Sequence, residues 1–108
     1  MRVLIHQRYL DLFDSQGVRY DRVRVYAEPQ ADGRWVGWLQ FVAAGTHLTI
    51  RTDRETTQAG AGAVAYWATG LQPVYLDGAL ARAERRAARA HAAAAVGRQP
   101  RTATPSRR

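Results

Sequence analysis

The strongest restriction on the fold comes from two alternating segments on either side of an Asp-Gly pair. In residues 20–27, apolar side chains alternate with polar or aromatic ones, with valines and Ala27 on one face. A period of two is typical of a β-strand, and Asp32-Gly33 between two such segments is typical of a tight turn. The two segments are therefore predicted to pair as an antiparallel hairpin.

The second segment of the hairpin, residues 34–42, is apolar on both faces. Trp35 lies on one face of the expected strand, and Trp38 lies on the other. Apolar residues on both sides are typical of a central strand. Residues 47–52 are predicted to add a third strand. The second face of this sheet would then need cover as well, most simply from another copy of the chain.

Three further segments have helical spacing or composition. Residues 3–15 carry four apolar residues spaced like one face of a helix, and Gly17 follows as a stop signal. A second helix is predicted over residues 63–70, and the alanine-rich residues 79–95 predict a third. For residues 74–76, a short edge strand and the opening turn of the last helix both fit the sequence.

These elements predict an α+β fold: a two-layer sandwich of a three-stranded antiparallel meander with an N-terminal and a following helix, then a projecting Ala/Arg-rich helix. Residues 1–78 contain eight arginines and eight acids, whereas residues 79–108 contain eight arginines against Glu84 alone. We therefore expect a folded domain over 1–78, a basic helix over 79–96 and a disordered basic tail over 97–108. A chain that ends at Gly78 is expected to keep its fold.

The basic helix carries four arginines on one stripe, within about 100° of one another around the helix axis. They are Arg82, Arg85, Arg86 and Arg89. Such a stripe suits the phosphates of a nucleic acid or another acidic partner. A solvated face in a chain from a GC-biased genome accounts for the same residues, and both interpretations stay open.

The polar run over residues 51–58 holds a second group of candidate contacts. This group consists of Arg51, Asp53, Arg54 and Glu55. At the junction of a strand and a helix, the arginines can hold a phosphate or a carboxylate. Capping of the following helix is the favoured alternative, because Thr52 and Glu55 have capping-box spacing.

Four aromatic residues invite a ligand-stacking interpretation: Trp35, Trp38, Tyr66 and Trp67. Trp35 and Trp38 are three positions apart on a strand, so they cannot form one platform. Packing in the core or at a subunit contact is favoured, and Trp38 in particular is predicted to be buried.

Other classes of function find little support. The chain has no cysteine, its three histidines share no metal-ligand spacing, and its serines lie in no hydrolase motif. We therefore expect no enzyme, no cofactor and no metal. Without a signal-like start or a stretch of roughly 18 apolar residues, a cytoplasmic protein without membrane contact is expected.

The expected function is that of a small non-enzymatic interaction module. It would self-associate or bind a protein through its sheet, with the basic arm available for an acidic partner. The alternative is a nucleic-acid-binding protein that uses the arginine-rich helix and tail. The tail contributes four arginines: Arg98, Arg101, Arg107 and Arg108.

Overall fold

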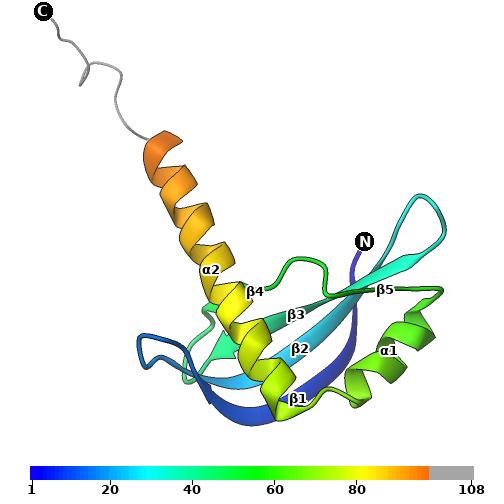
Figure 1. Cartoon of the computed structure of the whole chain (residues 1–108), viewed down its shortest axis with the longest axis horizontal. Helices are drawn as coiled ribbons and strands as arrows, with labels where there is room; N and C mark the ends of the chain where they lie inside the picture. Colours follow the sequence, from blue (N-terminus) through cyan, green and yellow to red (C-terminus); the bar gives the residue numbers. More distant parts are fainter. Residues whose placement is uncertain (98–108) are drawn as a thin grey trace, which may run out of the picture.

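The computed structural model describes residues 1–97 and shows one five-stranded antiparallel sheet with two helices on one of its faces (Figure 1). The elements follow in chain order: β1 (Val3–Phe13), β2 (Arg19–Pro29), β3 (Trp35–Ala43), β4 (Thr49–Arg51), β5 (Thr56–Gln58), α1 (Ala61–Thr69) and α2 (Pro73–Gly97). The sheet order is β1-β2-β3-β4, and β5 pairs with a different part of β3. The predicted α+β class is confirmed.

The N-terminal helix predicted over residues 3–15 is wrong, because this segment is β1, an edge strand of the sheet. β1 pairs antiparallel with β2 along its whole length. Register shifts between Leu4 and His6 and between Tyr9 and Leu12 interrupt the pairing. The helix-like spacing does not mark one buried face, because Ile5 and Leu12 contact the core whereas Tyr9 and Phe13 are exposed.

The predicted hairpin is confirmed as β2 and β3. The N–H of Gln30 donates to the carbonyl of Arg34 at 2.8 Å, and this bond closes the turn. Gly33 has a φ of 87°, a left-handed conformation that glycine adopts without strain. The third strand expected over residues 47–52 is confirmed in shorter form as β4.

The core lies between the sheet and the two helices. Its largest fully buried apolar residues on this side are Val23, Val25, Leu39, Phe41 and Val64. Helix α1 packs directly on the backbone of β3 at Gly37, where an added Cβ would lie 2.7 Å from Cγ1 of Val64 and 2.9 Å from Cγ2 of Thr56. The glycine is therefore a packing requirement, and a side chain there would push α1 away from the sheet.

The polar run after β4 continues along β3 instead of opening a helix. Thr52 is fully buried, its Oγ1 accepts a hydrogen bond from the N–H of Leu39 at 3.1 Å, and its own N–H donates to the Leu39 carbonyl at 2.9 Å. The N–H of Glu55 donates to the carbonyl of Gly37 at 2.8 Å. The capping interpretation of Thr52 and Glu55 is therefore wrong. Helix α1 follows Gly60 without a side-chain cap.

Helix α2 begins at Pro73, so residues 74–76 form its opening turn rather than an edge strand. Its buried residues are Leu76, Ala79, Leu80 and Ala83. Packing on the sheet thus continues past the domain boundary expected after Gly78. From Ala88 onward the described part of α2 is exposed, and it projects from the body (Figure 1). Gly97 ends α2, and the rest of the tail expected over 97–108 lies outside the described residues, including its four arginines: Arg98, Arg101, Arg107 and Arg108.

The face of the sheet opposite the helices is covered by side chains of the same chain. Trp38 is 2% exposed and is flanked by Tyr26, with ring centroids 4.8 Å apart, and by Arg51, whose guanidinium carbon lies 3.6 Å from the indole centroid. The predicted burial of Trp38 is confirmed. Trp35 packs against the core on the other face. Arginine and tyrosine of the same chain thus cover Trp38, and cover of the sheet by a second copy stays a prediction.

Candidate anion-binding cleft

Two groups of candidate residues, far apart in the sequence, meet beside helix α2. The loop over residues 52–55 connects β4 to β5 and runs next to α2. Between them lies a cleft of about 250 Å³, called here the arginine cleft, lined by Asp53, Arg54, Glu55, Arg82, Arg85 and Arg89. A second polar hollow of about 410 Å³ adjoins it and shares Arg54 and Glu55 with it.

Glu55 fastens the loop to α2. Its side chain is only 7% exposed, and it accepts hydrogen bonds from Arg82 Nη2 at 2.7 Å and Arg82 Nε at 3.0 Å. The hydroxyl of Tyr75 also donates to Glu55. Burial, followed by the hydrogen bond to Glu55 and the charge of that carboxylate, raises the pKa of Tyr75 to about 12. The hydrogen bond to Glu55 also raises the pKa of Arg82. Glu55 and Arg82 therefore act as one positioned pair at the base of the cleft.

Asp53 makes looser contacts at the mouth of the cleft. It accepts a hydrogen bond from Arg86 Nε at 2.7 Å, and Arg89 Nη2 lies 3.6 Å from its other oxygen. The hydrogen bond from Arg86, together with the charges of Arg86, Arg89 and Arg51, lowers the pKa of Asp53. Its side chain is 69% exposed. Water screens such exposed pairs, so an incoming anion can displace this carboxylate at little cost.

The four-arginine stripe of α2 is therefore divided. Arg82, Arg86 and Arg89 turn toward the acids of the 52–55 loop. Arg85 forms no ion pair within residues 1–97, and the same holds for Arg54 across the cleft. Arg54 comes from the loop and Arg85 from α2, and both line the cleft. They are the best placed to hold an added anion.

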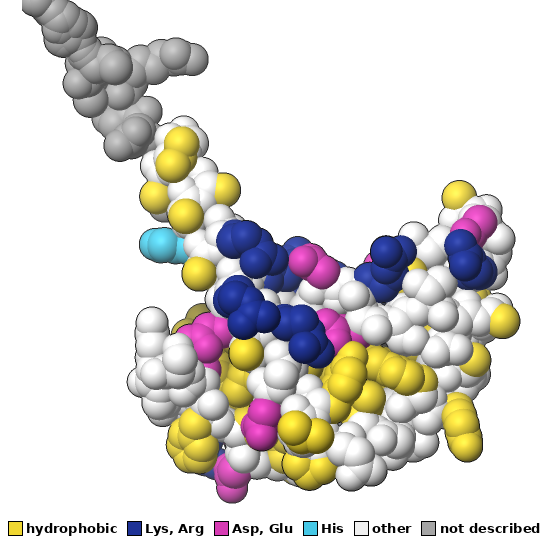
Figure 2. Space-filling model, viewed as in Figure 1, with side chains coloured by type: hydrophobic (Ala, Val, Ile, Leu, Met, Phe, Trp, Pro, Cys, Tyr) yellow, Lys and Arg dark blue, Asp and Glu magenta, His cyan; other side chains and the backbone are white. Residues whose placement is uncertain are grey.

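Positive charge predominates around the cleft. Six arginines gather there against three acids: Arg34, Arg54, Arg82, Arg85, Arg86 and Arg89 against Asp32, Asp53 and Glu55. Figure 2 shows dark-blue arginine side chains along the hollowed side between α2 and the β2–β3 hairpin, with magenta acids among them. The excess of three positive charges makes this side attractive to phosphates.

Arg51 differs from the other predicted contacts, because it lies on the outer face of the sheet over Trp38. Burial, followed by the charge of Arg86, lowers the pKa of Arg51. Its Nε donates to the carbonyl of Thr52 at 3.0 Å. Arg51 is thus already engaged in covering the sheet, whereas Asp53, Arg54 and Glu55 belong to the cleft.

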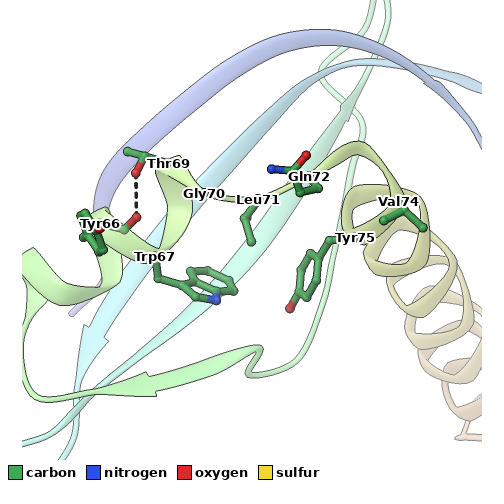
Figure 3. A pocket seen from close by; sticks show the side chains of 8 residues that line it. All are labelled: Tyr66, Trp67, Thr69, Gly70, Leu71, Gln72, Val74 and Tyr75. Atoms are coloured by element: carbon green, nitrogen blue, oxygen red, sulfur yellow. Dashed lines mark hydrogen bonds between the residues drawn. The ribbon is translucent and has the colours of Figure 1, made fainter.

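A second concave surface, which the sequence did not predict, lies where α1 meets α2. This apolar groove of about 470 Å³ is lined by Tyr66, Trp67, Thr69, Gly70, Leu71, Gln72, Val74 and Tyr75. Figure 3 shows the rings of Trp67 and Tyr75 pointing into the same space, with Leu71 beside them. The two rings meet edge to face, with centroids 6.0 Å apart. In the sequence, only the aromatic residues on both sides of Gly70 and Pro73 indicate this groove.

The four aromatic residues considered as a platform do not form one. Trp38 is enclosed on the outer face, while Trp35 and Trp67 are half-buried against the core. Tyr66 is 83% exposed and lines the groove. Packing is therefore confirmed for the three tryptophans. Tyr66 does not pack in the core, and its packing at a subunit contact stays a prediction.

Across residues 1–97, no group of three or more His, Asp or Glu side chains is arranged to hold a metal ion. Within the same residues, no helix has the length and apolar character needed to cross a membrane. Comparisons with protein-family models, with curated proteins and with solved structures found no significant match.

Proposed function

We propose that this protein is a non-enzymatic binding module that holds the phosphate backbone of a nucleic acid in the arginine cleft. The observation that carries the proposal is the meeting of two separate arginine groups on one side of the molecule, with three positive charges in excess. Guanidinium groups suit phosphate oxygens because they present several N–H donors in a planar fork. The nucleic-acid alternative is therefore preferred to association through the face of the sheet.

The roles of the arginines follow from their present contacts. Arg54 and Arg85 form no ion pair within residues 1–97, so they can bind a phosphate without breaking one. Arg86 and Arg89 exchange the exposed Asp53 for phosphate oxygens. Arg82 stays on Glu55 and holds the two walls of the cleft together.

The test measures the salt dependence of nucleic-acid affinity in the full chain. Arg54→Gln with Arg85→Gln should lower the slope of log affinity against log salt by up to about 1.4–1.8, since each lost phosphate contact removes about 0.7–0.9. Arg19→Gln with Arg24→Gln is the matched control, because it removes the same charge from β2. If both double substitutions lower the slope equally, the effect comes from net charge and not from the cleft. The absence of salt-dependent binding by the intact chain would refute the proposal.

A second candidate function, self-association, is favoured by the edge strand β1. Within the described residues, β1 pairs with β2 alone, and it exposes four large apolar side chains: Val3, Leu4, Tyr9 and Phe13. A long edge strand offers backbone groups for pairing with another strand. If two copies pair there, Tyr9→Lys with Phe13→Lys should give a folded monomer in sedimentation. A monomeric intact chain at high concentration would remove this candidate.

We also propose that the protein works in the cytoplasm. A chain without cysteine forms no disulfide, so an oxidising compartment would not stabilise it through disulfides. Measuring where a tagged full-length chain lies in fractionated cells tests this point.

A further inference from the structure

We infer that the apolar groove between α1 and α2 takes an unpaired base of a single strand whose phosphates lie in the arginine cleft. This inference rests on the proposed function and narrows its ligand from nucleic acids in general to single strands. The juxtaposition that carries it is a groove of aromatic walls next to a cleft of arginines. One nucleotide presents both matching chemistries, a planar base and a charged phosphate.

The two surfaces are joined by Tyr75. Its ring lines the groove, its hydroxyl donates to Glu55 in the arginine cleft, and the guanidinium carbon of Arg82 lies 5.3 Å from its ring centroid. Tyr75 therefore contacts residues of both surfaces, so the groove and the cleft lie next to each other. In Figure 2, yellow apolar side chains lie directly beside the dark-blue arginines of α2.

The groove has the features that stacking on a base requires. Tyr66 is 83% exposed and Trp67 is half-buried, so aromatic surface is available at one end (Figure 3). The side-chain amide of Gln72 is exposed at the rim and has no hydrogen-bond partner within residues 1–97. An amide of this kind can donate to and accept from the edge of any base. Stacking on aromatic rings tolerates any sequence, so we expect little preference among bases.

A duplex cannot use the groove, because its bases are paired and stacked inside the helix. It can reach only the arginines, through its phosphates. Single strands should therefore bind more tightly than a duplex with the same number of phosphates in contact. An acidic peptide supplies the charge but no planar ring for the groove. An acidic peptide should therefore bind with about the affinity of a strand without bases.

The experiment compares labelled ligands by fluorescence anisotropy with the full chain at fixed low salt. They are an oligothymidylate, the same strand with abasic sites throughout, a duplex of equal length, and a poly-glutamate peptide. The oligothymidylate should bind about tenfold more tightly than the abasic strand, the gain expected for one stacked base. Both strands should show the same salt slope, because their phosphates are identical.

Tyr66→Ala is the decisive variant, since its exposed side chain can be removed without opening the core. It should bring oligothymidylate affinity down to that of the abasic strand, without changing the abasic affinity or the slope. Tyr9→Ala, which removes another exposed tyrosine from β1, should have no effect. If Tyr66→Ala has no effect, or if the duplex binds as tightly, the groove holds no base while phosphate binding in the cleft stands.

Two further outcomes separate this inference from the proposed function. If no nucleic acid binds, the proposed function fails and the inference fails with it. If poly-glutamate binds as tightly as oligothymidylate, the partner is an acidic protein, and the base site is excluded.

Discussion

At the scale of single residues, the outer face of the sheet holds a buried side chain whose surroundings both stabilise and destabilise it. Trp38 shows this clearly: its indole lies between Tyr26 and Arg51 on the outer face, and its Nε1 is buried without a hydrogen-bond partner in residues 1–97. Stacking with a ring and a guanidinium stabilises the indole there. The buried N–H offsets part of that stabilisation.

Trp38→Ala should lower the free energy of unfolding by about 3–5 kcal/mol, the usual cost of emptying a large aromatic site. Trp38→Phe should cost clearly less. It keeps a ring beside Arg51 and removes the N–H that lacks an acceptor. Urea unfolding of both variants checks this. Equal losses from the two substitutions would contradict this prediction.

Tyr75 should make the fold sensitive to alkali. Its pKa is raised from 10.0 to about 12, chiefly by burial and then by Glu55, so the folded state favours the protonated phenol. The stability from this shift is fully present below pH 10 and is lost as pH rises from about 10 to 12. Tyr75→Phe should flatten the fall in unfolding free energy over that window. Tyr66→Phe is the control for an exposed tyrosine, and an unchanged profile in Tyr75→Phe would contradict the assignment.

At the scale of elements, α2 combines two segments with different surroundings. Its first half is amphipathic, with Leu76 and Leu80 in the core and Arg82 on Glu55. Its second half, from Ala88 onward, is exposed over the described residues and consists mostly of alanine. High helix propensity continues the helix beyond the point where packing ends. We therefore expect the fold to depend on the first half of α2.

Truncation separates these halves. A chain that ends at Gly78 loses Ala79, Leu80 and Ala83 from the core, and we expect it to lose cooperative unfolding or several kcal/mol of stability. A chain that ends at Ala90 keeps those residues and the four-arginine stripe, so it should unfold like the full chain. Thermal unfolding of the two fragments checks this. A stable fragment of residues 1–78 would support the domain boundary expected from charge.

At the scale of the whole molecule, the excess of positive charge is concentrated around the arginine cleft. The arginine cleft lies beside α2 and the β4–β5 loop, whereas β1 forms the opposite edge of the sheet. The groove lies closer to β1, because Arg8 of β1 donates to the carbonyls of Leu71 and Ala68. Phosphate binding in the cleft and self-association along β1 would therefore use separate surfaces. Within the cleft, Asp53 is the exposed acid that competes with an incoming phosphate for Arg86 and Arg89.

Asp53→Asn should raise the affinity for single-stranded nucleic acid at low salt, because it frees two arginines from a competing carboxylate. The fold should be unchanged, since the pair is exposed and screened. Asp11→Asn is the matched control: it removes the same charge from the pair with Arg19 on the β1–β2 hairpin. Anisotropy titrations of both variants check the prediction. An equal gain in both would show that only net charge matters.

The sequence by itself determined the elements whose signals are local. The β2–β3 hairpin follows from alternation and from a turn glycine that allows a positive φ, and these act within a few residues. The body of α2 follows from its alanine content in the same way. Within the candidate site, the four stripe arginines and the cluster around Asp53 could both be identified. Their meeting could not.

Only the tertiary structure decided the features that depend on a distant partner. β1 has helix-like spacing, but pairing with β2 and two bulges make it a strand. Thr52 and Glu55 have the spacing of a cap, but hydrogen bonds to β3 draw them along the sheet. Arg82 and Arg86 find their acids 27 and 33 residues away, so the cleft exists only once α2 has packed beside β4. A contact between distant segments forms when burial and pairing repay the entropy of closing the chain between them, and no local pattern records that balance.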